Sequence, residues 1–388
     1  MIKKLNKKIY LDYAATTPAD PRVVKAMLPY FSEKFGNTMS LHSFGQEAKE
    51  VLEQSRGMVA DLIGAKFNEI IFTSSATESN NLVLKGVALA NRGGHIIISS
   101  IEHACIMESA KWLEKQGFEI TRLPVDKYGL INPEHVKKEI KKDTILVSIM
   151  HANNEIGTIQ PIEEIGKICH AKKTLFHTDA AQSFGKIPID VNKMNIDLLT
   201  ASSHKMYGPK GVACLFIRQG IKIEPILHGG GHESGLRPST INLPAIVGFA
   251  KACEICKKQG KKESTRLIKL RDKLIKKVLK KIEGSCINGH FKKRLPNNAN
   301  FSFASVEGES IMLQLDLLGV AASTGSACSS AKLEPSHVLV AIGLKPEQAH
   351  GSLRLSLGRW TTEKEINYVL KILPEVIEKL RKISPFKK

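Results

Sequence analysis

The stretch EIIFTSSATESNNLVLKGVALANRGGHIIIS, residues 69–99, decides the fold class. It begins and ends with short apolar, β-branched runs, Glu69–Thr73 and His95–Ser99, which are typical of buried strands. Between them, Glu78–Ala90 has its apolar residues at the spacing of a helix with one buried face. Buried strands separated by a helix indicate a parallel sheet that is covered by helices.

The same alternation continues to about residue 218. Another helical pattern covers Ala104–Gln116, and five more runs have the pattern of strands: Phe118–Leu123, Thr144–Met150, Thr174–Asp179, Leu198–Ala201 and Val212–Arg218. We therefore expect an α/β fold built on a mostly parallel, seven-stranded sheet with helices on both faces.

The pattern changes after about residue 260. The predicted elements there are a long basic helix (Lys261–Lys281), a strand (Asn300–Ala304) and a final helix (Thr362–Lys382). We expect a large domain of residues 16–259 and a small α+β domain of residues 1–15 and 260–388. The glycine-rich stretch HGGGHESG, residues 228–235, is predicted to be a flexible loop.

Composition narrows the class of protein. Of the 388 residues, 42% are hydrophobic and 24% are charged, which is ordinary for a soluble chain with a large core. No apolar run approaches the ~20 residues that a membrane-spanning helix needs. The basic start, MIKKLNKKIY, has no apolar stretch behind it and does not resemble a secretory signal. We therefore expect a cytoplasmic protein that does not associate with a membrane.

The chain is strongly basic. The formal net charge is +19, from 57 lysines and arginines against 38 aspartates and glutamates, and such a charge attracts polyanions. Its densest basic segment, Lys261–Lys281, is either a solvated helix face or a docking surface for tRNA or an acidic protein. Aromatic residues make up only 6% and no nucleic-acid module is recognisable, so direct nucleic-acid readout is not expected.

The cysteines do not form a disulfide pattern. They are seven in number and irregularly spaced, which argues against a disulfide framework in a cytosolic chain. Cys253 and Cys256 form a lone C-x-x-C pair inside a helical stretch and lack the second half of a zinc site. Cys328 differs, because the small polar residues of TGSACSS (324–330) predict a mobile loop around it. The others are expected to be ordinary buried or half-buried thiols: Cys105, Cys169, Cys214 and Cys286.

Polar side chains follow five of the predicted strands, at the sheet edge where open parallel sheets bind ligands. The five groups are Ser74–Thr77, Glu102-His103, Asn153–Glu155, Asp179 with Gln182, and Ser202–Lys205. One Ser/Thr-rich helix start is usually only a cap, but five groups at one edge predict a binding site. Pyridoxal phosphate needs a lysine, a carboxylate at its ring nitrogen and a phosphate cup, which Lys205, Asp179 and Thr77 supply.

Five longer motifs stand out: LDYAATT (11–17), ATESNN (76–81), NNEIG (153–157), SHKMYGPKG (203–211) and STGSAC (323–328). Together they resemble the cysteine desulfurases, which are pyridoxal phosphate enzymes of fold type I, the aspartate aminotransferase fold. These enzymes supply sulfur for iron–sulfur clusters and for tRNA thiolation. The resemblance runs from residue 9 to about 385. It is closest to the first group, which includes the housekeeping desulfurase of iron–sulfur cluster assembly and carries its cysteine on a long loop, here about residues 321–334.

The resemblance implies roles for the residues around the cofactor ring. Lys205 forms the Schiff base and moves the substrate Cα proton, while Asp179 pairs with the ring nitrogen. Gln182 donates to the ring hydroxyl oxygen, and His103 stacks on the ring and acts as an acid or base. If the match were accidental, Gln182 and Asn154 would be structural residues of turns.

The resemblance also implies a phosphate site, a substrate site and a homodimer. Arg354 and Asn154 bind the carboxylate of L-cysteine, and Arg354 does so through a planar fork. Thr240 reaches the phosphate of the neighbouring subunit. Within one subunit the phosphate is held by Ala76, Thr77, Ser202 and His204, with Asn154 close to the cofactor.

The nucleophile that the family implies is Cys328. It attacks the substrate sulfur and leaves a Cys328 persulfide and L-alanine, with His103 as the expected base for the thiol. The persulfide then passes its sulfur to an iron–sulfur scaffold protein or to another acceptor protein. No resident metal is expected, although Cys328 could serve as a transient cluster ligand together with a scaffold.

Several residues depart from the family pattern. Ser75, Ser203 and Ser239 stand where housekeeping relatives usually carry glycine, and Pro238 replaces a small polar residue, so cofactor affinity is expected to differ. Those relatives also continue past the final helix with a tail that docks the scaffold, whereas this sequence has Pro385–Lys388 there. We therefore expect acceptor binding that is weak and salt-sensitive.

Two other functions fit parts of the sequence. A selenocysteine or cysteine lyase would share the cofactor site but would not need Cys328 on a long loop. A basic scaffold protein could have kept the fold without catalysis.

Overall fold

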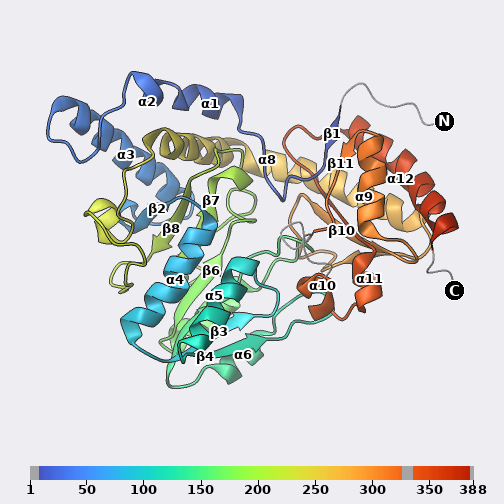
Figure 1. The fold of residues 1–388 in the computed structure, drawn as a ribbon, viewed down its shortest axis with the longest axis horizontal. Helices are drawn as coiled ribbons and strands as arrows, with labels where there is room; N and C mark the ends of the chain where they lie inside the picture. The colour runs from blue at the N-terminus through green and yellow to red at the C-terminus, as the bar shows by residue number, and fades with distance from the viewer. Residues whose placement is uncertain (1–7, 326–334, 385–388) are drawn as a thin grey trace.

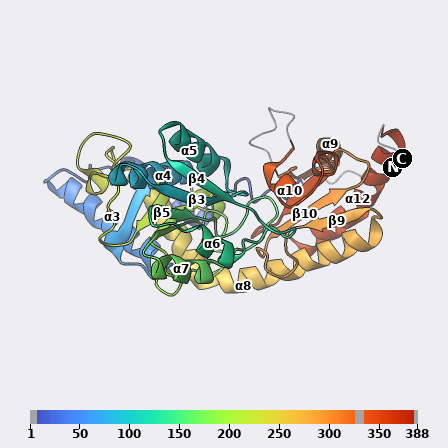
Figure 2. The same ribbon diagram turned by 90° about the horizontal axis from the view of Figure 1, so that it is seen from below.

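The computed structural model describes residues 8–325 and 335–384. Cys328 and the segment Pro385–Lys388 therefore lie outside the described residues. Figure 1 shows a large α/β part and a smaller part, and the helix α8 (Leu243–Lys281) runs through both. The view in Figure 2 shows α8 passing beneath both parts.

A seven-stranded sheet forms the centre of the large part. Its strands are β2 (Ile70–Thr73), β8 (Ala213–Ile217), β7 (Leu198–Ser202), β6 (Leu175–Asp179), β5 (Thr144–Ser148), β3 (His95–Ser99) and β4 (Glu119–Leu123), in this spatial order. The prediction of a mostly parallel, seven-stranded sheet is thus confirmed. The exception is β8, which runs antiparallel to both of its neighbours. A short connection from Ser202 to Ala213, with only one 3-10 turn and no α-helix, joins it to β7. A connection of that length is too short for a parallel crossover.

The sheet is buried on both faces. Successive residues of one strand, Leu146 and Val147 in β5, belong to two different apolar clusters. One cluster lies between the sheet and α3 (Ser43–Asp61), α7 (Ile162–Ala171) and the first half of α8. The other lies against α4 (Ala76–Asn91) and α5 (Ala104–Lys115). This double burial explains why the strands are continuous apolar runs in the sequence.

Helix α8 spans 39 residues without a break across positions 259–260. Its first half contributes Phe249 and Cys253 to the core of the large part, and its second half contributes Leu274 and Val278 to the core of the small part. Cys253 and its neighbour Cys256 are thus buried core residues. Within the described ranges, no group of three His, Cys, Asp or Glu side chains could hold a metal ion.

The small part is built on a three-stranded antiparallel sheet. Its strands are β9 (Ser285–Asn288), β10 (Asn298–Phe303) and β12 (Ser352–Ser356), and its helices are α9 (Gly308–Leu317), α10 (His337–Ala341), α11 (Pro346–His350) and α12 (Glu363–Ile383). The start of the chain joins it, because β1 (Ile9–Tyr10) pairs in parallel with β11 (Val320–Ala321). The remaining helices are α1 (Pro21–Met27), α2 (Pro29–Ser32) and α6 (Pro133–Glu139). No helix in either described range is long and apolar enough to cross a membrane.

Two predictions need correction here. The glycine-rich stretch at 228–235 is held in place, because Glu233 in the short turn η3 (His232–Gly235) is buried and accepts two hydrogen bonds from Arg56 at 2.8 Å. Glu233 also accepts from the backbone N–H of Phe72 at 2.7 Å. Cys286, expected to be buried or half-buried, is exposed on the small sheet.

Candidate active site

A cavity of about 550 Å³ opens at the carboxyl ends of the parallel strands, between the large and small parts. It gathers side chains from all five of the predicted groups. The predicted site residues that line it are Ala76, Thr77, His103, Asn154, Asp179, Gln182, Ser202, His204, Lys205 and Arg354. Thr240 is exposed and does not line the cavity of its own chain. Cys328 lies outside the described residues, but Gly325 and His337, on either side of its segment, both line the cavity.

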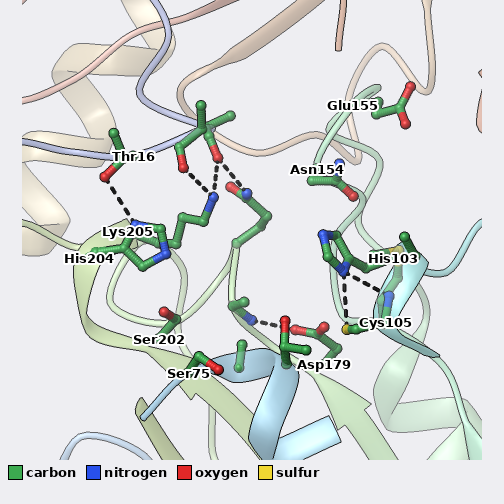
Figure 3. A pocket seen from close by; sticks show the side chains of 18 of the residues that line it. Thr16, Ser75, His103, Cys105, Asn154, Glu155, Asp179, Ser202, His204 and Lys205 are labelled. Atoms are coloured by element: carbon green, nitrogen blue, oxygen red, sulfur yellow. Dashed lines mark hydrogen bonds between the residues drawn. The ribbon is translucent and has the colours of Figure 1, made fainter. Parts of the chain in front are cut away.

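Lys205 is the central cation of this cavity. It ends the short turn η2 (Ser203–Lys205) that follows β7, and its ammonium donates to the carbonyl oxygens of Ala14 and Ala15, each at 2.6 Å. Figure 3 shows the side chain extending across the cavity from the His204 side. The LDYAATT segment therefore acts on the site through its backbone.

Asp179 lies at the end of β6 and is only 5% exposed. Its Oδ1 accepts from the backbone N–H of Ala181 at 2.9 Å, and its Oδ2 accepts from the Asn80 amide at 2.7 Å. Two donors fix the plane of this carboxylate. Gln182, three residues later, donates to the carbonyl oxygen of Ala14 at 2.9 Å. The same carbonyl oxygen accepts from the Lys205 ammonium.

The N-terminus of α4 forms one end of the cavity. Ser75 caps the helix, because its hydroxyl accepts from the backbone N–H of Glu78 at 3.1 Å. The first-turn N–H groups of a helix favour an anion, and Ala76 and Thr77 stand in that turn. Ser202 at the end of β7 also lines the cavity and is drawn near Ser75 in the view of Figure 3. This end of the cavity therefore offers amides and hydroxyls to an anion such as a phosphate.

His204 and Ser203 flank this end. The Nδ1 of His204 lies 3.0 Å from the Thr16 hydroxyl. Burial, followed by the charge of Lys205, lowers the pKa of His204 to about 4, so its ring is neutral at neutral pH. The Ser203 hydroxyl is buried and has no partner among the described residues. A Cβ at position 208 would lie 2.0 Å from that hydroxyl oxygen, so Gly208 makes room for the Ser203 side chain.

Arg354 in β12 reaches the cavity from the small part, and its side chain is 3% exposed. Its Nη2 pairs with Asp12 Oδ1 at 2.8 Å, and its Nη1 donates to the carbonyl oxygen of Asn154 at 2.9 Å. Its Nε is buried and finds no partner in the described part of the chain. A buried guanidinium with a free N–H at a cavity wall is suited to receive a carboxylate.

His103 caps α5, and its Nδ1 accepts from the backbone N–H of Cys105 at 3.2 Å. Burial is the largest influence on its pKa and lowers it, while the carboxylate of Asp179 acts in the opposite direction. Cys105, expected to be an ordinary thiol, lines the cavity with its Sγ 3.0 Å from that same Nδ1. Figure 3 shows both contacts.

Some cavity residues have no local sequence signal. Cys105 and His337 come from distant segments and are brought together only by the fold. Thr16 lies in the LDYAATT motif but was not among the predicted site residues. Glu155 belongs to a predicted group, but its bond to the Ser336 hydroxyl at 2.6 Å crosses 181 residues of chain. Gly325 also lies beside Glu155, because a Cβ there would be 3.4 Å from Glu155 Oε2. Glu155 thus lies next to residues on both sides of the segment that contains Cys328.

The donor set fits pyridoxal phosphate. An amine, a buried carboxylate and a helix N-terminus lined by hydroxyls surround one cavity, and the unpartnered Nε of Arg354 adds a site for a carboxylate. These four features are the ones that a cofactor of this kind and an amino-acid substrate need.

Comparisons with known proteins agree with this assignment. The model of the aminotransferase class-V family matches residues 9–369. Cysteine desulfurase IscS 1 of Archaeoglobus fulgidus is 55% identical over 378 residues, which cover 97% of this chain and 98% of that protein. Cysteine desulfurase IscS of Dictyoglomus turgidum is 54% identical over 385 residues, which cover 99% and 98%.

Solved structures give the same fold. A NifS-like protein superposes with a TM-score of 0.90 at 40% identity, covering 96% of this chain and 100% of that chain. SspA in complex with cysteine superposes with a TM-score of 0.82 at 38% identity, covering 91% and 100%.

Proposed function

The chain belongs to the aminotransferase class-V family and is a cysteine desulfurase; we propose that it works with pyridoxal phosphate bound in the cavity around Lys205. The observation that carries this proposal is the placement of the Lys205 amine in one cavity with the fixed carboxylate of Asp179. The substrate is L-cysteine, and the products are L-alanine and a protein-bound persulfide.

The cofactor would be held at three points. Lys205 would bind its aldehyde carbon, and Asp179 would keep its ring nitrogen protonated. Its phosphate would meet the backbone amides of α4 at Ala76 and the side chains of Thr77, Ser202 and His204. When bound, pyridoxal phosphate supplies the electron sink that makes the substrate Cα proton acidic.

The remaining residues orient the substrate. Arg354 binds the carboxylate through its guanidinium, which lines the cavity, and Asp12 keeps the guanidinium from turning away. Asn154 lies beside it, since its carbonyl oxygen accepts from Arg354. Lys205 moves the Cα proton, because its amine lines the cavity at the site proposed for the cofactor. Gln182 and His103 line the same cavity and would lie next to the ring.

Cys328 carries out the sulfur transfer. Its thiolate attacks the sulfur of L-cysteine, the Cβ–S bond breaks, and the two electrons of that bond stay with Cβ, which takes a proton to become the methyl group of alanine. The sulfur remains on Cys328 as a persulfide. Support comes from the cavity wall, since Gly325 and His337 on either side of this segment both line it. An acceptor protein, such as an iron–sulfur scaffold or a carrier for tRNA thiolation, then takes the sulfur in the cytoplasm.

We also propose that the protein is a homodimer. An exposed apolar patch covers the segment from α1 to the start of α3: Leu28 58%, Phe31 63%, Phe35 65%, Leu41 90% and Phe44 54% exposed. The Arg56–Glu233 pair ties the turn η3 to α3, and both lie at the same end of the large part (Figure 1). Thr240, five residues after η3, is exposed. A partner subunit covering this end would bury the patch and bring Thr240 to the partner's phosphate site.

Borohydride trapping tests the cofactor proposal. Reduction of the purified protein should fix a pyridoxyl group on one peptide, and mass spectrometry should place it on Lys205. A modified lysine elsewhere, Lys210 in particular because it also lines the cavity, would refute the assignment.

A further inference from the structure

A chain of four side chains runs along one wall of the cavity, from Asp179 through Asn80 and Cys105 to His103. The Asn80 amide nitrogen donates to Asp179 Oδ2 at 2.7 Å and to Cys105 Sγ at 3.2 Å. The Cys105 sulfur then lies 3.0 Å from His103 Nδ1. Asn80 is fully buried, so this chain is shielded from water on its inner side.

The direction of each hydrogen bond follows from the chemistry of the groups. A carboxylate only accepts, so the Asn80 nitrogen and not its oxygen must face Asp179, which leaves the oxygen buried without a partner in the described residues. The same nitrogen donates its second hydrogen to the Cys105 sulfur. Burial, with the nearby charge of Asp179, raises the pKa of Cys105 to about 12, so the thiol keeps its own hydrogen. The Thr77 hydroxyl lowers this pKa by hydrogen bonding to the same sulfur, so it acts there as a donor, and the thiol hydrogen points at His103 Nδ1.

His103 Nδ1 therefore receives two hydrogens from one residue. The backbone N–H of Cys105 donates to it at 3.2 Å, and the Cys105 thiol faces it at 3.0 Å. A ring nitrogen that accepts from a backbone N–H has no room for a proton of its own. The neutral ring must then carry its proton on Nε2, the nitrogen that lies on the cavity side in Figure 3.

We propose that Cys105 is a positioning residue that holds His103 in the form protonated at Nε2, so that His103 meets the cavity as a proton donor. Asn80 aligns the thiol and links it to Asp179. This departs from the expectation that His103 is the base for Cys328, because a neutral ring of this form has no lone pair on its cavity side. The proposal depends on the proposed function in one respect only, the identity of the group in the cavity that receives the Nε2 proton.

The charged groups around His103 are compatible with a neutral ring. Burial is the largest influence and lowers its pKa, Asp179 raises it, and Lys205 and His337 lower it. Two of these three neighbours therefore act in the same direction as burial. A neutral ring at neutral pH is the state in which one nitrogen must be a donor and the other an acceptor.

Nitrogen-15 NMR of the holoenzyme with labelled histidine tests the proposal directly. The His103 signals are assigned by their loss in His103→Gln. In the wild-type protein, Nε2 should show a bonded proton and Nδ1 should not. A proton on Nδ1 would overturn the proposal, and this measurement needs no variant of Cys105 to fold.

Variants of Cys105 separate the thiol from the backbone cap. Cys105→Ala removes one donor to the neutral ring and should raise the midpoint of the His103 titration by about 0.5 to 1 pH unit. Cys105→Ser keeps a hydroxyl donor and should restore the wild-type midpoint. Cys169→Ala, which removes a buried thiol from α7, is the matched control and should leave the midpoint of the His103 titration unchanged. Identical titrations in Cys105→Ala and the wild type would overturn the role of the thiol.

Activity measurements keep this inference apart from the proposed function. The limb of the pH profile for alanine formation that belongs to His103 should move with the NMR midpoint in Cys105→Ala and return in Cys105→Ser. If the NMR results hold while His103→Gln makes alanine at the wild-type rate, the positioning by Cys105 stands and the proposed role of His103 in catalysis fails.

Discussion

Arg354 and Asp12, which are 342 residues apart in the chain, form an ion pair at 2.8 Å. It joins the small sheet to the LDYAATT segment and holds the guanidinium of Arg354 at the cavity that this residue lines. The buried Nε has no partner among the described residues. We propose that this guanidinium receives the substrate carboxylate, so the pair would connect the packing of the two parts to substrate recognition.

Arg354→Lys should weaken L-cysteine binding. A lysine keeps the charge but loses the planar fork, and a lost charge-assisted hydrogen bond of about 1.5–3 kcal/mol corresponds to a 10- to 100-fold rise in KM. Steady-state rates of alanine formation at varied L-cysteine concentration give this KM. Arg122→Lys, at an exposed pair with Glu114, is the matched control and should leave KM unchanged. An unaltered KM in Arg354→Lys would remove Arg354 from the substrate site.

Lys205→Ala should abolish turnover and the visible absorbance of lysine-bound cofactor, because it removes the amine that the Ala14 and Ala15 carbonyl oxygens hold in the cavity. The control is Lys210→Ala, which removes a second lysine from the same cavity wall and should keep the band. Absorbance spectra of the two purified variants decide the matter. Survival of the band in Lys205→Ala would contradict the assignment.

Glu233→Gln should destabilise the large part. The side chains of Glu233 and Arg56 are 1% and 9% exposed. The substitution leaves the buried guanidinium with Glu53, which is 41% exposed and 3.4 Å away, as its remaining counter-charge, at a cost of about 3 kcal/mol. Glu47→Gln is the control, since Glu47 and Lys34 are 48% and 45% exposed and such pairs contribute little. Thermal unfolding should show a clear fall in midpoint for the first variant and almost none for the second. Equal midpoints would mean that η3 is not anchored by this pair.

Glu102 should make stability fall as the pH rises. Burial raises its pKa from 4.5 to about 8 in the folded state, with Oε2 unpartnered in the described residues. The carboxyl group is therefore protonated in the folded protein up to about pH 8, while the unfolded chain releases that proton near pH 4.5. This contribution to stability is complete below pH 4.5 and is lost progressively between pH 4.5 and 8.

Glu102→Gln mimics the protonated acid and should remove that pH dependence, making the variant more stable than the wild type at pH 8 by on the order of 4 kcal/mol, with little difference at pH 5. Unfolding in denaturant at the two pH values measures it. Glu108→Gln, whose carboxylate is 67% exposed, should behave as the wild type at both. The contradicting result is a stability gain of Glu102→Gln over the wild type that is smaller at pH 8 than at pH 5. It would show that Glu102 is ionised in the folded protein.

The sequence was sufficient to predict the strands and the family, because buried parallel strands are continuous apolar runs and the motifs around Lys205 and Cys328 are long. The direction of β8 could not be read from its residues, since strand direction depends on the length of the connection. The single helix α8 was predicted as two stretches, because its two halves pack in different cores and so have different patterns.

The site could be predicted only where its residues lie in local motifs. Glu233 was missed because its partner Arg56 is 177 residues away, and glycines around it suggested a loop. Cys105 has the local pattern of an ordinary helix residue, and only the fold places it between Asn80 and His103. Long-range hydrogen bonds of this kind leave no periodicity in the sequence.

We propose that the sulfur of L-cysteine is transferred to Cys328. A single-turnover experiment with sulfur-35 L-cysteine measures this transfer. Peptide mapping under non-reducing conditions should find one persulfide sulfur on Cys328 for each alanine formed. Cys328→Ser should keep its cofactor, form almost no alanine and carry no label, while Cys286→Ser, which removes an exposed cysteine, should match the wild type. Alanine formation at the wild-type rate by Cys328→Ser, with the sulfur released as elemental sulfur, would rule out Cys328 as the acceptor and identify a lyase.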